Sequence, residues 1–187
     1  MGYLINQQDV LNFLHNQMGK RIPPGGTDDD LKRYIQAAFD YAWRYYRWPW
    51  AMKTADTEAD GTLPTDFDLD GYYDLKDTYP ITWDSDNSRL VLDGVSAATE
   101  VTYQMAPPTL GTDAAGSAPF PSVAAVAEGA LIFAKMGENP SRADIQQEWD
   151  LFHSLLDRLA ARSDNNVSHR PRNFHDVAGT YPGDTGS

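Results

Sequence analysis

The spacing of apolar residues changes twice along this 187-residue chain, and those changes limit the fold more than any other feature. Up to the aromatic sequence at 45–50, apolar residues recur every three or four positions, as on a helix. From 51 to about 105 they alternate with polar residues, as on strands, and from 123 they return to helical spacing. Pro49 cannot continue a helix, so the first change falls there. The sequence therefore predicts an α+β fold in which a β-rich segment is inserted into a helical body.

Two helices are expected before the aromatic sequence. Asn6 can cap the first, with Asp9 three residues on. Thr27 can cap the second, and the three aspartates that follow it favour the positive end of the helix dipole. The second helix, 27–47, has two apolar stripes, so we expect one to face the core of the protein and the other a different surface. The stripes consist of Leu31, Ile35, Ala38, Ala42 and Tyr46, and of Tyr34, Tyr41 and Tyr45.

The segment 51–106 is predicted to form a small antiparallel sheet of hairpins. Apolar and polar residues alternate at four places, and turn-forming residues at 84–88 and 93–94 separate them. Residues 107–118 are rich in Pro, Gly, Ala and Ser and are predicted to form a loop that is long for a connector, and therefore either exposed or used for a contact. The alternating residues are Tyr73 and Leu75, Ile81 and Trp83, Leu90 and Leu92, and Val101, Tyr103 and Met105.

Two further helices are predicted after this loop. The first, 123–135, is rich in small residues around Ala127, which let another helix approach closely. Ser141 can cap the second, with Asp144 at the capping-box position. The apolar residues of the second helix have the spacing of a helix-packing seam. They are Ile145, Trp149, Phe152, Leu156 and Leu159.

These segments predict a helical body of about four helices, formed by 1–50 and 119–162, with the β-hairpin insertion between them. The residues from 163 to 187 carry isolated apolar side chains among polar ones and cannot bury a core of their own. We expect this segment, called the C-terminal arm below, to be extended and to become ordered only against a partner.

Composition excludes several classes of function. The chain has no cysteine, which rules out disulfides, thiolate catalysis and Cys-based zinc sites. Its formal net charge of −12 argues against a protein whose main task is to grip nucleic acid, because phosphate contacts need Lys and Arg. No apolar run approaches the ~20 residues of a membrane span. The pattern of a signal peptide and a phosphate-binding glycine loop are also lacking.

The four histidines indicate no catalytic or metal site. His15 and His153 lie on predicted helices and are interpreted as ordinary polar residues. His169 and His175 are six positions apart, but nothing near them completes the coordination shell of a metal. Since neither His15 nor His153 has a sequence partner that resembles a nucleophile or a catalytic acid, we expect no enzyme and no cofactor.

One motif has the spacing of a calcium site. The run that begins at position 66 places carboxylates at loop positions 1, 3, 5, 9 and 12 and glycine at position 6, as in an EF-hand, except that Asp replaces the usual Glu at position 12. Gly61, Pro64 and Pro80 oppose the flanking helices that an EF-hand requires, so a solvated acidic turn between strands is favoured. A calcium-binding module, or a small hydrolase built on this acidic loop, is the alternative hypothesis. Its ligands would be Asp66, Asp68, Asp70, Asp74 and Asp77.

A basic cluster in the C-terminal arm stands out against the acidic average of the chain. It has two interpretations: random charge in a tail, or an electrostatic anchor for an acidic partner surface with aromatic anchors beside it. The predicted partner-binding residues are His169, Arg170, Arg172, Phe174 and Tyr181.

Three short sequences, together with the order of the segments, carry a resemblance to a family. They are YYRWPW at 45–50, LPTDF at 63–67 and VTYQMAPP at 101–108, which closes the predicted sheet. With the last two helices and the arm, they resemble the head-to-tail adaptor (connector) proteins of tailed bacteriophages, of the podovirus type. In that family a helical body carries a β-rich insertion, and a ring of copies sits beneath the portal.

The resemblance implies a structural virion protein that is located at the neck and assembled in the host cytoplasm, with no membrane partner. A head-completion or tail-terminator protein of a phage is a further hypothesis that the sequence leaves open. The resemblance also implies a homo-oligomeric ring, twelve copies to match the portal, that joins the portal to the next tail component, a nozzle or tail tube. The helices would pack side by side around the ring, the arm would dock on the portal and the β insertion would face the tail. DNA would pass through during ejection without specific binding, which suits the negative charge.

Overall fold

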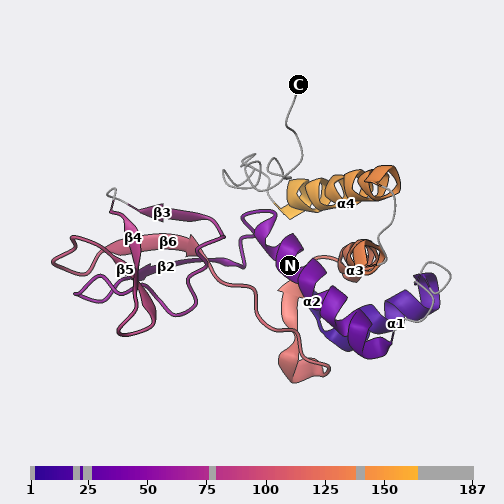
Figure 1. Cartoon of the computed structure of the whole chain (residues 1–187), viewed down its shortest axis with the longest axis horizontal. Coiled ribbons are helices and arrows are strands. Elements are labelled where there is room, and N and C mark those ends of the chain that lie inside the picture. Colours follow the sequence, from indigo (N-terminus) through magenta and orange to yellow (C-terminus); the bar gives the residue numbers. More distant parts are fainter. Residues whose placement is uncertain (1–2, 19–21, 23–26, 76–78, 138–141, 164–187) are drawn as a thin grey trace. The chain divides into compact units, whose positions relative to one another are not determined.

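The chain folds into two compact units, which Figure 1 shows as ribbons. The helical unit is drawn from Met1–Trp50 and Pro107–Ser168, and the described residues of the β unit lie in Ala51–Ala106. The computed structural model describes residues 3–18, 22, 27–75, 79–137 and 142–163. Within them, four helices and several antiparallel strands give the α+β class that the sequence predicts. None of these helices is long and apolar enough to cross a membrane.

Among its described residues, the helical unit combines four α-helices with one pair of short strands. In chain order its elements are β1 (Tyr3–Ile5), α1 (Gln7–Met18), α2 (Asp28–Arg44), the 3-10 helix η2 (Ala114–Gly116), β7 (Ala118–Phe120), α3 (Val123–Gly137) and α4 (Arg142–Ser163). Strand β1 pairs antiparallel with β7, and α3 contacts each of the other three helices (Figure 1).

The first two helices begin where the sequence predicts. The Asp9 backbone N–H donates to the Asn6 side chain at 2.9 Å, which caps α1. The Asp30 backbone N–H donates to Thr27 Oγ1 at 3.2 Å, and the Thr27 N–H donates back to the Asp30 carboxylate at 3.2 Å, which caps α2. These reciprocal bonds satisfy donors that the first turn of a helix otherwise leaves without partners. Helix α2 ends at Arg44, before the Trp48-Pro49 pair that was predicted to break it.

Helix α2 also buries residues that lie outside its two predicted apolar stripes. Phe39 and Trp43, which belong to neither predicted stripe, are also buried, and the Phe39 ring lies 5.7 Å from Phe120 of β7. The sequence did not predict β1 or β7, so it gave no partner for this third side. All residues of the first predicted stripe are buried: Leu31, Ile35, Ala38, Ala42 and Tyr46.

In the second predicted stripe of α2, which consists of tyrosines, Tyr41 and Tyr45 contact α4 of the same chain. The Tyr41 hydroxyl lies 2.6 Å from His153 Nε2, and the Tyr45 hydroxyl donates to the Asp157 carboxylate at 2.9 Å. The ring of Tyr41 also lies 5.0 Å from that of Trp149. This stripe was expected to face a surface outside its own core, but α4 provides intrachain contacts for both tyrosines.

The segment predicted to be a loop, 107–118, is hydrogen-bonded to α2 and contains a short 3-10 helix. The Gln36 side chain accepts from the Leu110 backbone N–H at 2.8 Å and donates to the Pro108 carbonyl at 3.2 Å. The Gly111 N–H donates to the Gly116 carbonyl at 2.7 Å across η2. Contacts between one half-buried glutamine side chain and the backbone leave no periodic signal in the sequence, so composition alone did not decide between an exposed loop and a used one.

In its described residues, the β unit contains two small sheets instead of the one sheet of hairpins that was predicted. Strand β6 is central in the first sheet, between β2 and β3, and β4 pairs with β5 in the second. All these pairs are antiparallel. The core of the unit consists of Leu63, Phe67, Leu92, Val101 and Tyr103. The strands are β2 (Met52–Asp56), β3 (Tyr73–Leu75), β4 (Ile81–Asp84), β5 (Arg89–Leu92) and β6 (Glu100–Gln104).

The LPTDF sequence joins the beginning and the end of the β unit. Its Phe67 forms a bridge with Met105, and the Asp66 carbonyl accepts from the Ala106 N–H at 2.8 Å. The Met105 N–H donates to the Ala51 carbonyl at 2.8 Å. The segments that enter and leave the unit are therefore held together, as an inserted unit requires.

Candidate interaction surface of the β unit

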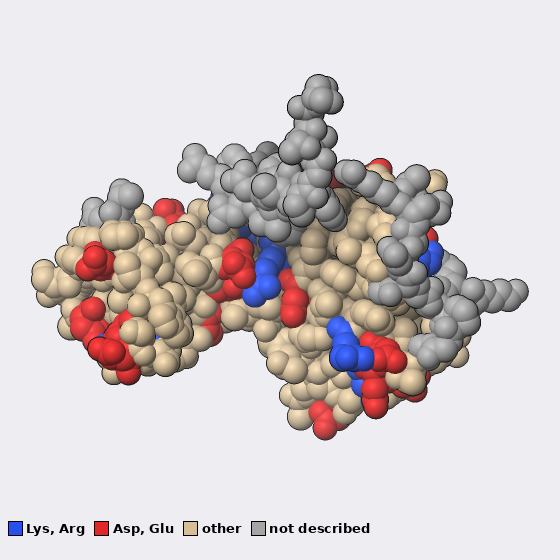
Figure 2. Space-filling model, in the orientation of Figure 1, with Lys and Arg blue, Asp and Glu red and all other residues tan. Residues whose placement is uncertain are grey.

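The β unit carries most of the negative charge of the protein. Residues 51–106 contain twelve Asp or Glu and three Lys or Arg, a formal charge of −9 out of −12 for the chain. On the face shown in Figure 2, carboxylates are spread over this unit, at the left of the picture. Two of its three cations, Lys53 and Arg89, are described, and each is bound to carboxylates of the unit itself. A partner of this surface is therefore expected to bring positive charge or to be repelled.

Asp66 lies at the centre of a polar cluster at the edge of the core. It accepts from the Tyr103 hydroxyl at 2.5 Å and from the Lys53 ammonium at 2.9 Å. Burial disfavours its ionised form, but the hydrogen bonds from Lys53 and Tyr103 outweigh burial and hold the pKa of Asp66 below its usual value. Burial, and then the bond to the Asp66 carboxylate, raises the pKa of Tyr103 to about 12. Both groups are thus held in one protonation state near neutral pH, as in a structural contact.

We expect Asp66→Asn to lower the free energy of unfolding by about 1 kcal/mol at pH 7, because it removes charge-assisted bonds from a partly exposed site. The folded pKa of Asp66 is lowered, so its contribution is complete above the unfolded pKa near 4 and is lost as the pH falls through the folded value. Urea unfolding from pH 7 to pH 2 should show the difference between wild type and variant shrinking toward zero. Asp70→Asn, at an exposed position, is the control. A difference that persists unchanged at pH 2 would contradict this account.

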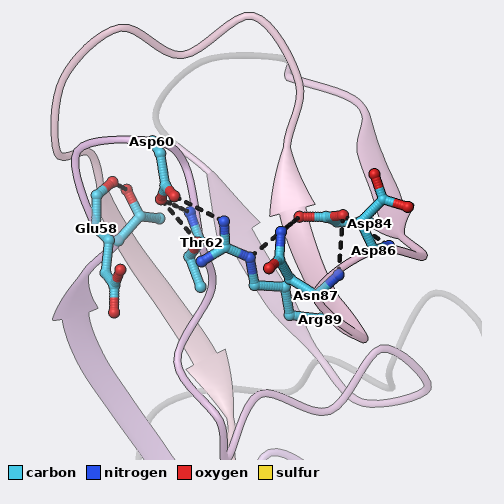
Figure 3. A network of polar contacts seen from close by, with 8 residues as sticks. Glu58, Asp60, Thr62, Asp84, Asp86, Asn87 and Arg89 are labelled. Carbon is cyan, nitrogen blue, oxygen red and sulfur yellow. Dashed lines mark hydrogen bonds and ion pairs between the residues drawn. The ribbon is translucent and has the colours of Figure 1, made fainter.

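Arg89 joins two turns of the β unit (Figure 3). Its guanidinium donates to Asp60 at 2.8 Å through Nη2 and to Asp84 at 3.2 Å through Nε. Asp60 also accepts from the hydroxyl of Thr62 at 2.7 Å, and Asp84 accepts from the Asn87 side chain at 2.8 Å. The planar guanidinium suits such a bridge between carboxylates. The network holds the turn between β4 and β5 against the turn at 58–62.

The outer face of the three-stranded sheet is acidic. Asp56 of β2 and Glu100 of β6 are directly opposite each other, and Asp74 of β3 is opposite Thr102 of β6. The Thr102 hydroxyl lies 2.9 Å from that of Thr54, so this face is polar throughout its middle. Asp56, Asp74 and Glu100 are all exposed, so this face adds to the negative charge of the unit.

Trp83 is the most conspicuous apolar side chain on the surface of the β unit. It is opposite Leu90 in the β4–β5 pair, and its side chain is 61% exposed. Strand β5 is bonded on its other side as well, where the Leu63 N–H donates to the Leu90 carbonyl at 3.0 Å. β4 is therefore the outer strand of this layer, and among the described residues no strand other than β5 pairs with it. A large exposed aromatic beside an open strand edge is typical of an interaction surface.

Among the candidate calcium ligands that the structure describes, no three are grouped to hold a metal ion. Asp66 is engaged by Lys53 and Tyr103, while the Asp68 carboxylate accepts from the Asp70 backbone N–H at 3.2 Å. The segment runs between strands, not helices. In the part of the chain that the structure describes, no three Asp, Glu or His side chains are grouped to hold a metal ion. Asp74 is exposed on β3, and Asp77 lies outside the described residues.

The remaining candidate residues fall into two groups. His15 is exposed and lies 3.0 Å from the Asp28 carboxylate, and His153 stacks on Tyr45 with ring centroids 5.4 Å apart. His153 is therefore part of the interface between α2 and α4, not an ordinary residue of a polar helix face. The predicted partner-binding residues of the arm lie outside the described residues: His169, Arg170, Arg172, Phe174 and Tyr181.

Sequence reasoning missed two features of this surface. The alternation at 81 and 83 predicted that Trp83 would face the same core as Ile81, but the core ends before it and leaves the indole exposed. The Arg89 network joins residues that are 29 positions apart, and no short-range sequence pattern indicates that these residues form an ion pair. The signal that was available is charge: only three cations occur in 51–106, so each was a candidate for an ion pair.

No model of a known protein family matches this sequence, and no curated protein matches it either.

Proposed function

We propose that this chain is a structural head-to-tail adaptor of a tailed phage. It would form a ring at the neck of the virion that joins the portal to the next tail component. The observation that carries the proposal is the insertion of a separate acidic β unit, Ala51–Ala106, into a helical unit formed by the segments before and after it. This is the organisation of the family that the sequence resembles.

The proposed parts have different tasks. The helices form a bundle-like body whose copies pack around a ring, twelve to match the portal, and the β-hairpin insertion faces the nozzle or tail tube. The extended C-terminal arm docks on the portal. Because Tyr41 and Tyr45 contact α4 of the same chain, ring contacts are expected to use other side chains of the helical unit than these two.

The charge distribution supports a channel through which DNA passes without being held. A surface that carries −9 over 56 residues repels phosphates that come within about a Debye length, near 8 Å at physiological salt. A binder of DNA would need the opposite sign. The described cations of the β unit are already engaged by carboxylates, so they are not free to bind phosphates.

The proposal is tested with the portal protein encoded in the same genome. The purified full chain should bind the portal as a ring, seen by mass photometry and electron microscopy, and deletion of 164–187 should weaken portal binding at least about tenfold. Deletion of 183–187 alone, beyond Tyr181, is the matched control and should leave binding intact. If the full chain does not bind the portal, the proposed function is wrong. If only the deletion has no effect, the docking role of the arm is wrong.

A further inference from the structure

We propose that the β4 edge with Trp83 is the docking surface for the basic stretch of the C-terminal arm, residues 169–174, of a second copy of this chain. This inference rests on the ring of copies in the proposed function. It assigns the basic stretch to contacts between neighbouring copies and leaves the later residues of the arm, Tyr181 among them, to the portal.

The docking surface offers both apolar and main-chain contacts. The Trp83 indole is 61% exposed on an outer strand, next to the exposed Thr82. Tryptophan is enriched among the residues that dominate binding energy, and an open strand edge can accept an extended segment. Figure 3 shows the adjoining turn held by Arg89, so the surface is already ordered before a partner arrives and binding loses less entropy.

Negative charge borders this surface. Figure 3 shows the carboxylate of Asp86 directed away from the Arg89 network, and Asp86 is exposed. Asp93 is exposed at the other end of the β4–β5 pair, where its N–H donates to the Pro80 carbonyl at 2.9 Å. A cationic segment is therefore the complementary occupant, whereas an acidic or uncharged one gains nothing from these carboxylates.

The basic stretch of the arm has the complementary pattern. Alternate positions hold Arg170, Arg172 and Phe174, and alternate side chains share one face when a segment is extended. Pro171 favours extended backbone at the residue before it. A guanidinium stacks well on the face of an indole and pairs with carboxylates at the same time. Two arginines and one aromatic thus match an exposed tryptophan bordered by carboxylates.

The arm is long enough to reach a neighbour. The described chain ends at Ser163, and positions 170–174 follow it by seven to eleven residues. An extended segment of that length spans about 25–40 Å. That is comparable with the width of a small domain, so the stretch can cross from one copy to the next in a ring.

The absence of cysteine allows a direct test by cross-linking in the full chain. One copy carries Thr82→Cys on β4, the other carries Asn173→Cys in the arm, and the mixture is treated with a short bis-maleimide. We expect cross-linked dimers at least about tenfold more abundant than with Thr65→Cys, an exposed position of the same unit, in place of Thr82→Cys. The yield should fall as salt rises, because the contacts include ion pairs.

Trp83→Ala in the Thr82→Cys copy should reduce the cross-linked dimer about tenfold, whereas Leu69→Ala, which also removes an exposed apolar side chain of the unit, should not. Arg170→Ala with Arg172→Ala in the other copy should have the same effect as Trp83→Ala. Equal yields from Thr65→Cys and Thr82→Cys would overturn the proposal. So would a chain carrying both cysteines that cross-links only within itself. Portal binding is measured separately, so either result can arise while the proposed function stands.

Discussion

Replacing Trp48 with alanine should lower the free energy of unfolding of the helical unit by about 3–5 kcal/mol, the range for removal of a large buried aromatic. The Trp48 side chain is 0% exposed. Its ring lies 5.2 Å from that of Trp50, in a stacked arrangement, and 5.4 Å from that of Phe120, edge to face. Its Nε1–H donates to the Ala42 carbonyl at 2.8 Å near the end of α2. Alanine would leave a large cavity, and the Ala42 carbonyl would lose the hydrogen bond from the indole.

Guanidinium unfolding followed by far-UV circular dichroism measures this loss. Trp48→Phe separates its two causes, because it keeps much of the ring volume but cannot donate to Ala42. Its loss should be smaller than that of Trp48→Ala. Trp83→Ala is the matched control: it removes the same side chain from an exposed position and should change the free energy by less than about 0.5 kcal/mol. Similar losses for Trp48→Ala and Trp83→Ala would contradict the placement of Trp48 in the core.

The starts of α1 and α2 and the core stripe of α2 could be predicted because each depends on nearby residues. Capping by Asn6 and Thr27 uses side chains within three positions of the N–H groups they bind. The stripe of α2 repeats with the pitch of the helix. Such local rules need no knowledge of distant segments, so they hold for a single sequence.

The arrangement of the strands could not be predicted, because it depends on residues that are far apart in the sequence. Strand β6 pairs with β2, which places Met52, near the start of the unit, opposite Gln104, near its end. Nothing in the sequence of either strand indicates which strand it pairs with. Strands β1 and β7 are three residues each, too short for a periodic signal, and their pairing joins segments more than a hundred positions apart. Hairpins were expected because neighbours along the chain pair most often.

Of the candidate interaction surface, only the negative charge could be predicted from the sequence. An acidic protein with few cations between 51 and 106 follows from composition, but the exposure of Trp83 depends on where the core of the β unit ends. The carboxylates of the calcium motif showed the limit of spacing arguments. Their order along the chain matches a calcium loop, yet Asp66 is used by Lys53 and Tyr103 within the fold.

Gly129→Val should lower the free energy of unfolding by about 3 kcal/mol, the upper part of the range for overpacking a core. A Cβ at this position would lie 2.8 Å from Phe152 Cζ and 2.9 Å from Ala38 Cβ. Helix α3 therefore needs glycine where α2 and α4 both approach it. The sequence predicted close helix approach at the small residues near Ala127, and the structure places such an approach within one chain. Thermal and guanidinium unfolding measure the loss, with Met136→Val at an exposed position of the same helix as the control.

A double-mutant cycle identifies the atoms responsible. Gly129→Ala adds only the Cβ, and its gain in helix propensity of about 1 kcal/mol opposes the clash. In the wild-type background we expect the clash to prevail. Phe152→Leu removes the ring atom nearest to the new methyl, so in that background Gly129→Ala should cost at least 1 kcal/mol less, a coupling of the size found for residues in contact. Strictly additive effects would show that the Phe152 ring moves aside freely, and α4 would then not be packed against α3 as tightly as the buried Phe152 indicates.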